Sequence, residues 1–139
     1  MAITQTMTDT CKEDLLTGDV HFDTDTFKIA LFTSDATLDA STTAYSTTNE
    51  VSGTGYTAGG NTLSGASVTV SDNVAFVDFA DTTWASSTIT ARGALVYNTS
   101  NSNASIAVLD FGSDKTSSNS TFQVTFPAAS ATTALIRIE

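Results

Sequence analysis

The stretch FKIALF, Phe27 to Phe32, indicates the fold class of this chain. Its large apolar residues Phe27, Ile29 and Leu31 recur at every second position, the spacing that places side chains on one face of a β-strand. We therefore expect a strand with one better-buried face here, and we expect the hydrophobic core to begin at this strand.

The rest of the chain also contains segments that predict β-strands. Further strands are predicted where apolar and β-branched residues run between Ser, Asn, Asp, Gly or Pro. These segments are residues 67–70, 74–79, 91–97, 105–111, 121–126 and 134–138. Seven or more short strands with frequent turns are typical of a sandwich or a barrel. We expect an all-β fold, a single-domain antiparallel β-sandwich of jelly-roll-like or immunoglobulin-like type, over residues 1–139.

Three polar segments are predicted to connect strands. Residues 34–48 are too polar for a core strand and read as an ordered surface loop, with Tyr45 as an apolar anchor. Residues 98–103 are typical of a hairpin connection. Residues 112–120 are predicted to play the same role, before the strand that ends at Pro127.

Residues 1–22 form the predicted N-terminal helical or extended segment. The spacing of Thr10 and Glu13 is that of a capping box, and Gly18 is placed to end a helix. Met7, Cys11 and Leu15 are four residues apart and predict its buried stripe. A helix this short needs packing against something else to be stable.

Composition limits the classes of partner. The chain has 139 residues, of which 40% are hydrophobic and 14% charged, and its net charge is -10. Ser and Thr make up roughly a third of it, well above average usage. Such an acidic chain repels phosphate backbones, so direct nucleic-acid binding is not expected.

Processing and redox signals are absent from the sequence. A single cysteine, Cys11, excludes an intrachain disulfide and a cysteine-based metal cluster. No apolar run reaches the length of about 20 residues that a membrane helix needs, and the N-terminus is a poor secretory signal. We expect a soluble protein made in the cytoplasm.

The segment VSGTGYTAGG, residues 51–60, holds four of the eight glycines: Gly53, Gly55, Gly59 and Gly60. A phosphate-binding loop of the Walker type needs a lysine after its last glycine and a following helix. Here Asn61 follows Gly60, and no helix is predicted next. We interpret the glycines as conformational, set by positive φ angles or by close approach of another chain segment, with Tyr56 as the one large side chain.

Titratable residues form no catalytic pattern. Asp23 and Asp25 lack the spacing of a calcium loop and are interpreted as a solvated turn. Asp78 and Asp81 form a carboxylate pair of the kind glycosidases use, but turn residues are the simpler interpretation. His21 has no nucleophile motif around it and is predicted at the surface or at an interface. No enzyme activity, cofactor or metal is expected.

Five side chains are candidates for an interface: Tyr45, Tyr56, Trp84, Arg92 and Arg137. Trp84 lies in residues 81–98, where a polar turn is predicted to precede a strand containing Arg92. Trp84 is more often a core residue closing one end of a sandwich than an interface anchor. Each arginine is expected to pair with a carboxylate, either across strands or across a subunit boundary.

Four blocks of the sequence, residues 25–65, 77–98, 107–127 and 134–139, together resemble a family of small structural proteins of tailed bacteriophages, including marine and cyanobacterial phages. The likeness runs from residue 12 to the end and is specific as a series of blocks. It implies a noncatalytic, β-rich virion component present in many copies. GDVHFDTDT, residues 18–26, departs from the family by having more acids.

The resemblance leaves several roles open. The first is a capsid decoration or cement protein on the lattice of the major capsid protein, as a homo-oligomer or symmetric array. The second is a tail, collar or head-to-tail connection component that contacts tail or connector proteins. A third, from another class, is a carbohydrate-binding adhesion module that would use Tyr45, Tyr56 and Trp84 as its platform. The first two roles place the chain in the virion.

Overall fold

The stretch Phe27–Phe32 forms β2, a strand buried on both faces. In the computed structural model, which describes residues 2–139, Phe27, Ile29 and Leu31 contribute to one hydrophobic cluster. Ala30 and Phe32 contribute to a second cluster on the other side. The period of two is confirmed, but the expectation of one better-buried face is too narrow, because β2 lies between two layers of apolar side chains.

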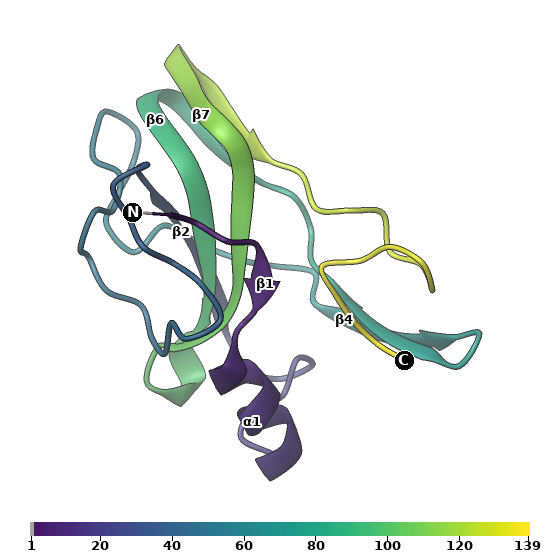
Figure 1. Cartoon of the computed structure of the whole chain (residues 1–139). Coiled ribbons are helices and arrows are strands. Elements are labelled where there is room, and N and C mark those ends of the chain that lie inside the picture. Colours follow the sequence, from purple (N-terminus) through teal and green to yellow (C-terminus); the bar gives the residue numbers. More distant parts are fainter. Residues whose placement is uncertain (1) are drawn as a thin grey trace.

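β2 belongs to a five-stranded antiparallel sheet with the order β1-β7-β6-β2-β3. β1 covers Thr6–Met7 and β3 covers Asn61–Thr62 at its two edges. β6, Thr82–Asn98, and β7, Ala104–Val124, form a long hairpin that dominates the sheet (Figure 1). A short 3-10 turn, Thr99–Asn101, joins them, as predicted for residues 98–103.

A second antiparallel sheet contains three strands in the order β4-β5-β8. β4 covers Ser67–Ser71, β5 covers Val74–Asp78 and β8 covers Ile136–Ile138. Asp72 and Asn73 both have positive φ, 52° and 65°, which is the backbone of a two-residue turn of type I′. The sheet extends away from the long hairpin as an arm (Figure 1). Two antiparallel sheets and one helix confirm the all-β prediction and are consistent with a β-sandwich.

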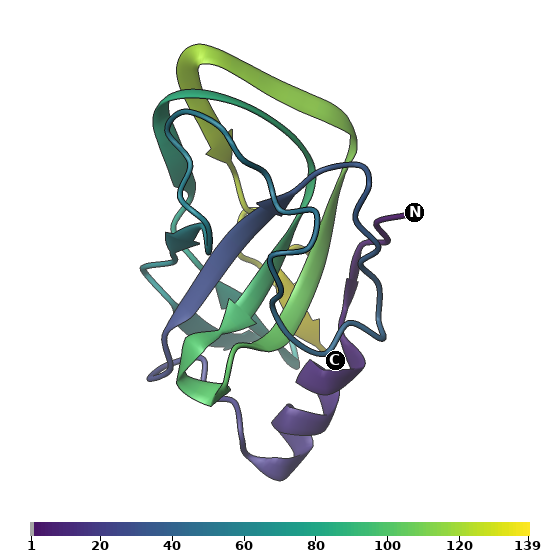
Figure 2. The ribbon, with the colours of Figure 1, turned by 90° about the vertical axis from the view of Figure 1, so that its left-hand side faces the viewer.

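The helix α1, Asp9–Thr17, begins two residues before the predicted start. Thr8 is its N-cap and accepts from the Cys11 backbone N–H at 3.2 Å, so the capping box proposed at Thr10 is wrong. Thr8 is favoured because its hydroxyl is buried against β7, where it also donates to the Ser105 carbonyl at 3.2 Å. Gly18 ends the helix in the left-handed conformation, as predicted. Figure 2 shows α1 beyond one end of the large sheet.

Residues 112–120 belong to β7, so the prediction of a polar connection there is wrong. The polar turn predicted before residue 91 is also strand, as part of β6. The two segments pair with each other, with Thr90 opposite Thr116 and Ile89 opposite Ser117. Their backbone groups pair across the hairpin. Shifts in register, as at β-bulges, accommodate the unequal numbers of residues on the two strands.

Residues 33–50 contain no regular strand, as predicted for the loop at 34–48. Ala36 and Leu38 are buried against the second hydrophobic cluster, so the loop covers one face of the large sheet. The small sheet joins the first cluster from the other side through Val77 and Ile136. The large sheet is therefore the middle layer, between the loop and the small sheet.

Candidate functional site

One carboxylate, that of Glu50, binds the glycine-rich segment to the loop that precedes it. Glu50 lies just before it, and its Oε1 accepts from the Tyr56 hydroxyl at 2.6 Å and from the Gly59 N–H at 2.7 Å. Its Oε2 accepts from the Tyr45 hydroxyl at 2.7 Å. Tyr97 completes the group by donating to the Gly59 carbonyl at 2.7 Å. All three tyrosines of the chain thus converge on this Glu50 cluster.

The Glu50 cluster is built from distant parts of the chain. The Tyr45 and Tyr97 rings stack with centroids 4.5 Å apart, which joins the 33–50 loop to β6. The Tyr56 hydroxyl also accepts from the Leu31 N–H at 2.9 Å, on β2. Burial raises the pKa of Tyr45, Tyr56 and Tyr97, and the negative Glu50 raises them further. Such tyrosines keep their protons and act as hydrogen-bond donors.

The four glycines lie where the segment meets its neighbours. All have positive φ, from 74° at Gly60 to 153° at Gly53. A Cβ on Gly55 would lie 2.8 Å from the Ser87 Cα, and one on Gly60 would overlap the Ile29 carbonyl oxygen. The segment therefore runs directly over β2 and β6, and its glycines permit that contact.

Trp84 is buried, with 4% of its surface exposed. Its ring meets Phe122 edge to face at 6.1 Å and lies 6.0 Å from Tyr56. Among residues 2–139 its indole Nε1 is the one buried side-chain nitrogen or oxygen without a hydrogen-bond partner. Trp84 is thus buried, while Tyr45 and Tyr56 are half-buried with their hydroxyls bound to Glu50, so the three rings do not form an exposed aromatic platform.

Both candidate arginines are engaged within the chain. Arg92 Nε donates to Asp110 Oδ1 at 3.2 Å, across β6 and β7. Asp110 also accepts from the Gly112 N–H at 2.9 Å, and these two contacts, the backbone one first, lower the pKa of its carboxyl. Arg137 donates to the Ala131 carbonyl at 2.9 Å and to Glu139 at 2.7 Å.

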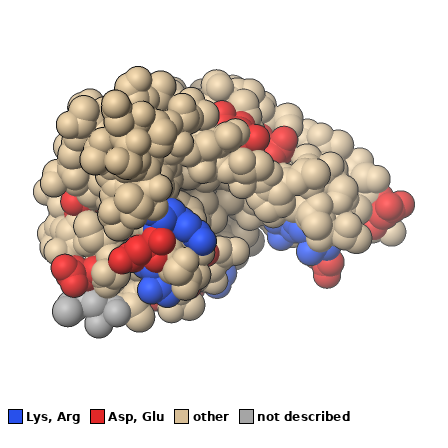
Figure 3. All heavy atoms as spheres, turned by 90° about the horizontal axis from the view of Figure 1, so that it is seen from above, with Lys and Arg blue, Asp and Glu red and all other residues tan. Residues whose placement is uncertain are grey.

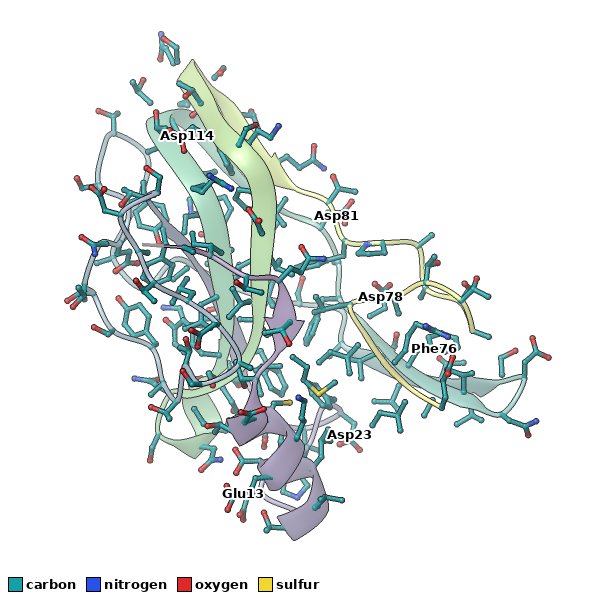
Figure 4. The ribbon with its side chains drawn as sticks, in the orientation of Figure 1. Glu13, Asp23, Phe76, Asp78, Asp81 and Asp114 are labelled. Carbon is teal, nitrogen blue, oxygen red and sulfur yellow. The ribbon has the colours of Figure 1, made fainter. Side chains whose placement is uncertain are left out.

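The acidic pairs serve local backbone geometry. Asp25 accepts from the His21 N–H at 2.9 Å and from Asn98 at 2.8 Å, which closes a turn. Asp81 accepts from the Phe126 N–H at 2.9 Å. Figure 4 shows Asp23 near α1 and apart from Asp78 and Asp81. Within residues 2–139 no three potential metal ligands gather.

The arm has one apolar face, which the sequence analysis did not identify. The ladder places Val68 opposite Val77 and Val70 opposite Ala75, while Ala75 and Val77 lie opposite Ile138 and Ile136. Directly opposed residues share a face, so six aliphatic side chains form one surface of the β4-β5-β8 sheet, here called the arm face. Val77 and Ile136 are buried against the body, but Val68, Val70 and Ile138 are 52%, 72% and 49% exposed.

The other face of the arm is covered over β5, while Ser67, Thr69 and Ser71 of β4 are exposed on it. Phe76 lies opposite Arg137 and is only 6% exposed. Figure 4 shows it on the side toward the segment that leads into β8, where Arg137 contacts Ala131. The alternation of Val68 and Val70 with Ser67, Thr69 and Ser71 does signal a two-faced strand, but a pattern cannot say which face the chain covers.

A second apolar region lies between β1, β7 and the C-terminal segment. It is a groove of about 440 Å³ lined by side chains including Met7, Leu109, Phe111 and Leu135. No titratable side chain lines this groove, so its side chains provide no acid or base group for catalysis.

No family model matches this chain, and neither the curated proteins nor the solved structures give a significant match. Among the described residues, no helix is long and apolar enough to cross a membrane.

Proposed function

We propose that this chain is a noncatalytic structural protein of a bacteriophage virion, and that it decorates the capsid by binding the major-capsid lattice. The observation that carries the proposal is the arm face, where the aliphatic side chains of Val68, Val70 and Ile138 are about half exposed or more. A contiguous apolar surface rimmed by polar residues is typical of a protein–protein contact. A lattice of capsid subunits supplies the cover.

The remaining surface suits a role in an assembly. Ser and Thr make up roughly a third of the chain, and their short side chains donate and accept hydrogen bonds with little loss of rotamer freedom. In Figure 3 most of the arm is neither acidic nor basic. Weak individual contacts suffice when many copies bind a symmetric shell. Once one subunit of an oligomer is bound, the contacts of its other subunits with the shell form as intramolecular steps.

The sequence blocks that resemble phage structural proteins support the same proposal. They include residues 25–65 and 77–98, which contain β2, the Glu50 cluster and all of β6. In this proposal they maintain a rigid scaffold that presents the arm. The adhesion alternative has less support, because Trp84 is buried and the Tyr45 and Tyr56 hydroxyls are bound to Glu50.

The experiment is add-back of the purified protein to capsids that lack it. We expect saturable binding and greater resistance to heat and to osmotic shock. Ile138→Asp places a charge on the arm face and should abolish binding. Leu16→Asp is the matched control, because Leu16 is 90% exposed on α1, away from the arm face. Equal capsid resistance with and without the protein would contradict the stabilising role.

Labelling of intact particles separates decoration from the tail alternative. Decoration predicts label distributed over the whole shell. Label confined to the tail or to one vertex would replace decoration with a collar or connector role.

A further inference from the structure

The arm also has an exposed edge strand, β4. The order β4-β5-β8 makes β4 and β8 the two edge strands of the small sheet. β4 pairs regularly with β5 over five residue pairs, from Ser67 to Ser71. Its other side presents backbone N–H and C=O groups to solvent, and all five of its residues are exposed.

The two edges differ in protection. Natural sheets blunt an exposed edge with charges, proline, a bulge or a very short strand. β8 has three residues and carries the Arg137–Glu139 ion pair at 2.7 Å. β4, with the sequence SVTVS, has no charge, no proline and no irregularity in register. Only β4 is left open to pairing.

The sequence of β4 reads the same in both directions, Ser-Val-Thr-Val-Ser, centred on Thr69. A second copy running antiparallel across a two-fold axis at Thr69 places Val68 opposite Val70 of the partner and Ser67 opposite Ser71 of the partner. Side chains that are directly opposed lie on the same face, so valine meets valine and hydroxyl meets hydroxyl. An isologous contact of this kind needs such self-complementarity.

Charge favours the same site. The chain carries a net charge of -10, so two copies repel each other over most orientations. β4 is an uncharged strand in this acidic protein, which makes it a place where two copies approach without opposing carboxylates in the strand itself.

We propose that two copies of this chain pair through β4 to form a continuous six-stranded sheet, β8-β5-β4 followed by β4-β5-β8 of the second copy. The pairing uses the edge of the arm and leaves the arm face of both copies on one side. The dimer thus presents a doubled apolar platform, and the protected β8 edges at its two ends stop further growth. The inference concerns two copies of this chain alone and stands or falls independently of capsid binding.

The test is a charge-swap experiment on the β4 register. One variant carries Val68→Lys and Val70→Lys, and the other carries Val68→Glu and Val70→Glu. Both positions are more than half exposed, so each variant should retain the fold, which far-ultraviolet circular dichroism checks. In the proposed register, residue 68 always meets residue 70 of the partner. Each variant alone therefore places like charges together, and the 1:1 mixture places opposite charges together.

Sedimentation at micromolar concentration gives the readout. We expect the natural sequence to be a dimer, each variant alone to be a monomer, and the mixture to form a heterodimer. A monomeric natural sequence, or dimers of either variant alone, would overturn the proposal. A mixture that stays monomeric would overturn the register.

Ile138→Asp distinguishes edge pairing from face-to-face packing. Ile138 lies on the arm face but on β8, away from the proposed edge. Edge pairing predicts that this variant remains a dimer even if it no longer binds capsids. Loss of the dimer in Ile138→Asp would show that two copies meet through their faces, contrary to the proposal.

Discussion

At the scale of the residue, Glu50 is the side chain that binds the 33–50 loop to the glycine-rich segment. Its carboxylate accepts from two tyrosine hydroxyls and one backbone N–H. These bonds join the 33–50 loop to the glycine-rich segment, and Tyr56 and Gly59 in turn bind Leu31 of β2 and Tyr97 of β6. The sequence analysis singled out Tyr45 and Tyr56 but missed Glu50 and Tyr97, because a lone acid before a glycine-rich segment has no local signature.

Glu50→Ala should destabilise the fold by about 2–3 kcal/mol, because three donors lose their charged acceptor in a partly buried site. Chemical denaturation measures this loss. Glu13→Ala removes the same charge from an exposed position on α1 (Figure 4) and should change the stability by less than about 0.5 kcal/mol. Equal effects of the two substitutions would show that the Glu50 cluster contributes nothing.

The three tyrosines predict a dependence of stability on pH. Burial raises the pKa of each tyrosine in the folded chain. The next cause is the hydrogen bond to Glu50 for Tyr45 and Tyr56, and the Glu50 charge for Tyr97. The unfolded value is about 10. A raised pKa in the folded state stabilises the fold below pH ~10, and this contribution is lost as the pH rises further.

Ultraviolet titration of tyrosinate measures this directly. We expect no ionisation near pH ~10 while the circular dichroism is native, and release of all three protons together with unfolding at higher pH. The denatured chain is the control, with ordinary titration. A tyrosine that ionises at its ordinary pH in the folded chain would contradict the cluster.

Gly60 tests the close contact between the glycine-rich segment and β2. Gly60 and Gly112 both have positive φ, 74° and 81°, but only Gly60 faces a neighbour, the Ile29 carbonyl. Gly112→Ala should cost about 1 kcal/mol from backbone strain alone. Gly60→Ala should cost about 3 kcal/mol or more, because the segment has to move. Similar melting temperatures of the two variants would argue against the contact.

At the scale of the element, the β6–β7 hairpin shows that hydroxyl side chains can hold a long strand pair together. Ser87 and Ser117 are both buried, and their Oγ atoms lie 2.7 Å apart. Thr90 and Thr116 repeat the pair at 3.0 Å on an exposed site. The hairpin thus extends beyond the apolar core by pairing hydroxyls across its strands.

A double-mutant cycle on Ser87→Ala and Ser117→Ala should give a coupling of about 0.5–1.5 kcal/mol, because each hydroxyl satisfies the other in a buried site. The same cycle on Thr90 and Thr116 should give a value near zero, since water replaces the lost partner. Denaturation of the single and double variants measures both. Equal couplings would mean that burial is not what gives the serine pair its strength.

The sequence predicts strands where apolar residues repeat, as at Phe27–Phe32, and it predicts the turn at 98–103 from local polarity. It fails at 112–120, because Ser and Thr suit turns and exposed strands alike. What makes this segment a strand is its partner 26 residues earlier, with Thr116 opposite Thr90. The register between two strands this far apart in sequence depends on the tertiary fold, and the local sequence does not indicate it.

At the scale of the whole molecule, the large sheet is covered by a loop on one side and by the small sheet on the other, while the arm extends beyond that cover. The candidate surface follows from this arrangement. Val68 and Val70 are visible in the sequence as one face of a strand, but only the fold shows that β4 lies at an edge with its apolar side open. We propose that capsid binding occupies the arm face and that a second copy occupies the edge.

The central claim is that this chain is a multicopy component of a virion shell. Quantitative mass spectrometry of virus particles purified from the source that encodes the chain tests this most directly. The proposal predicts the chain in every particle preparation, at a fixed ratio to the major capsid protein and in many copies per particle. Its absence from purified particles that contain the major capsid protein would contradict the claim.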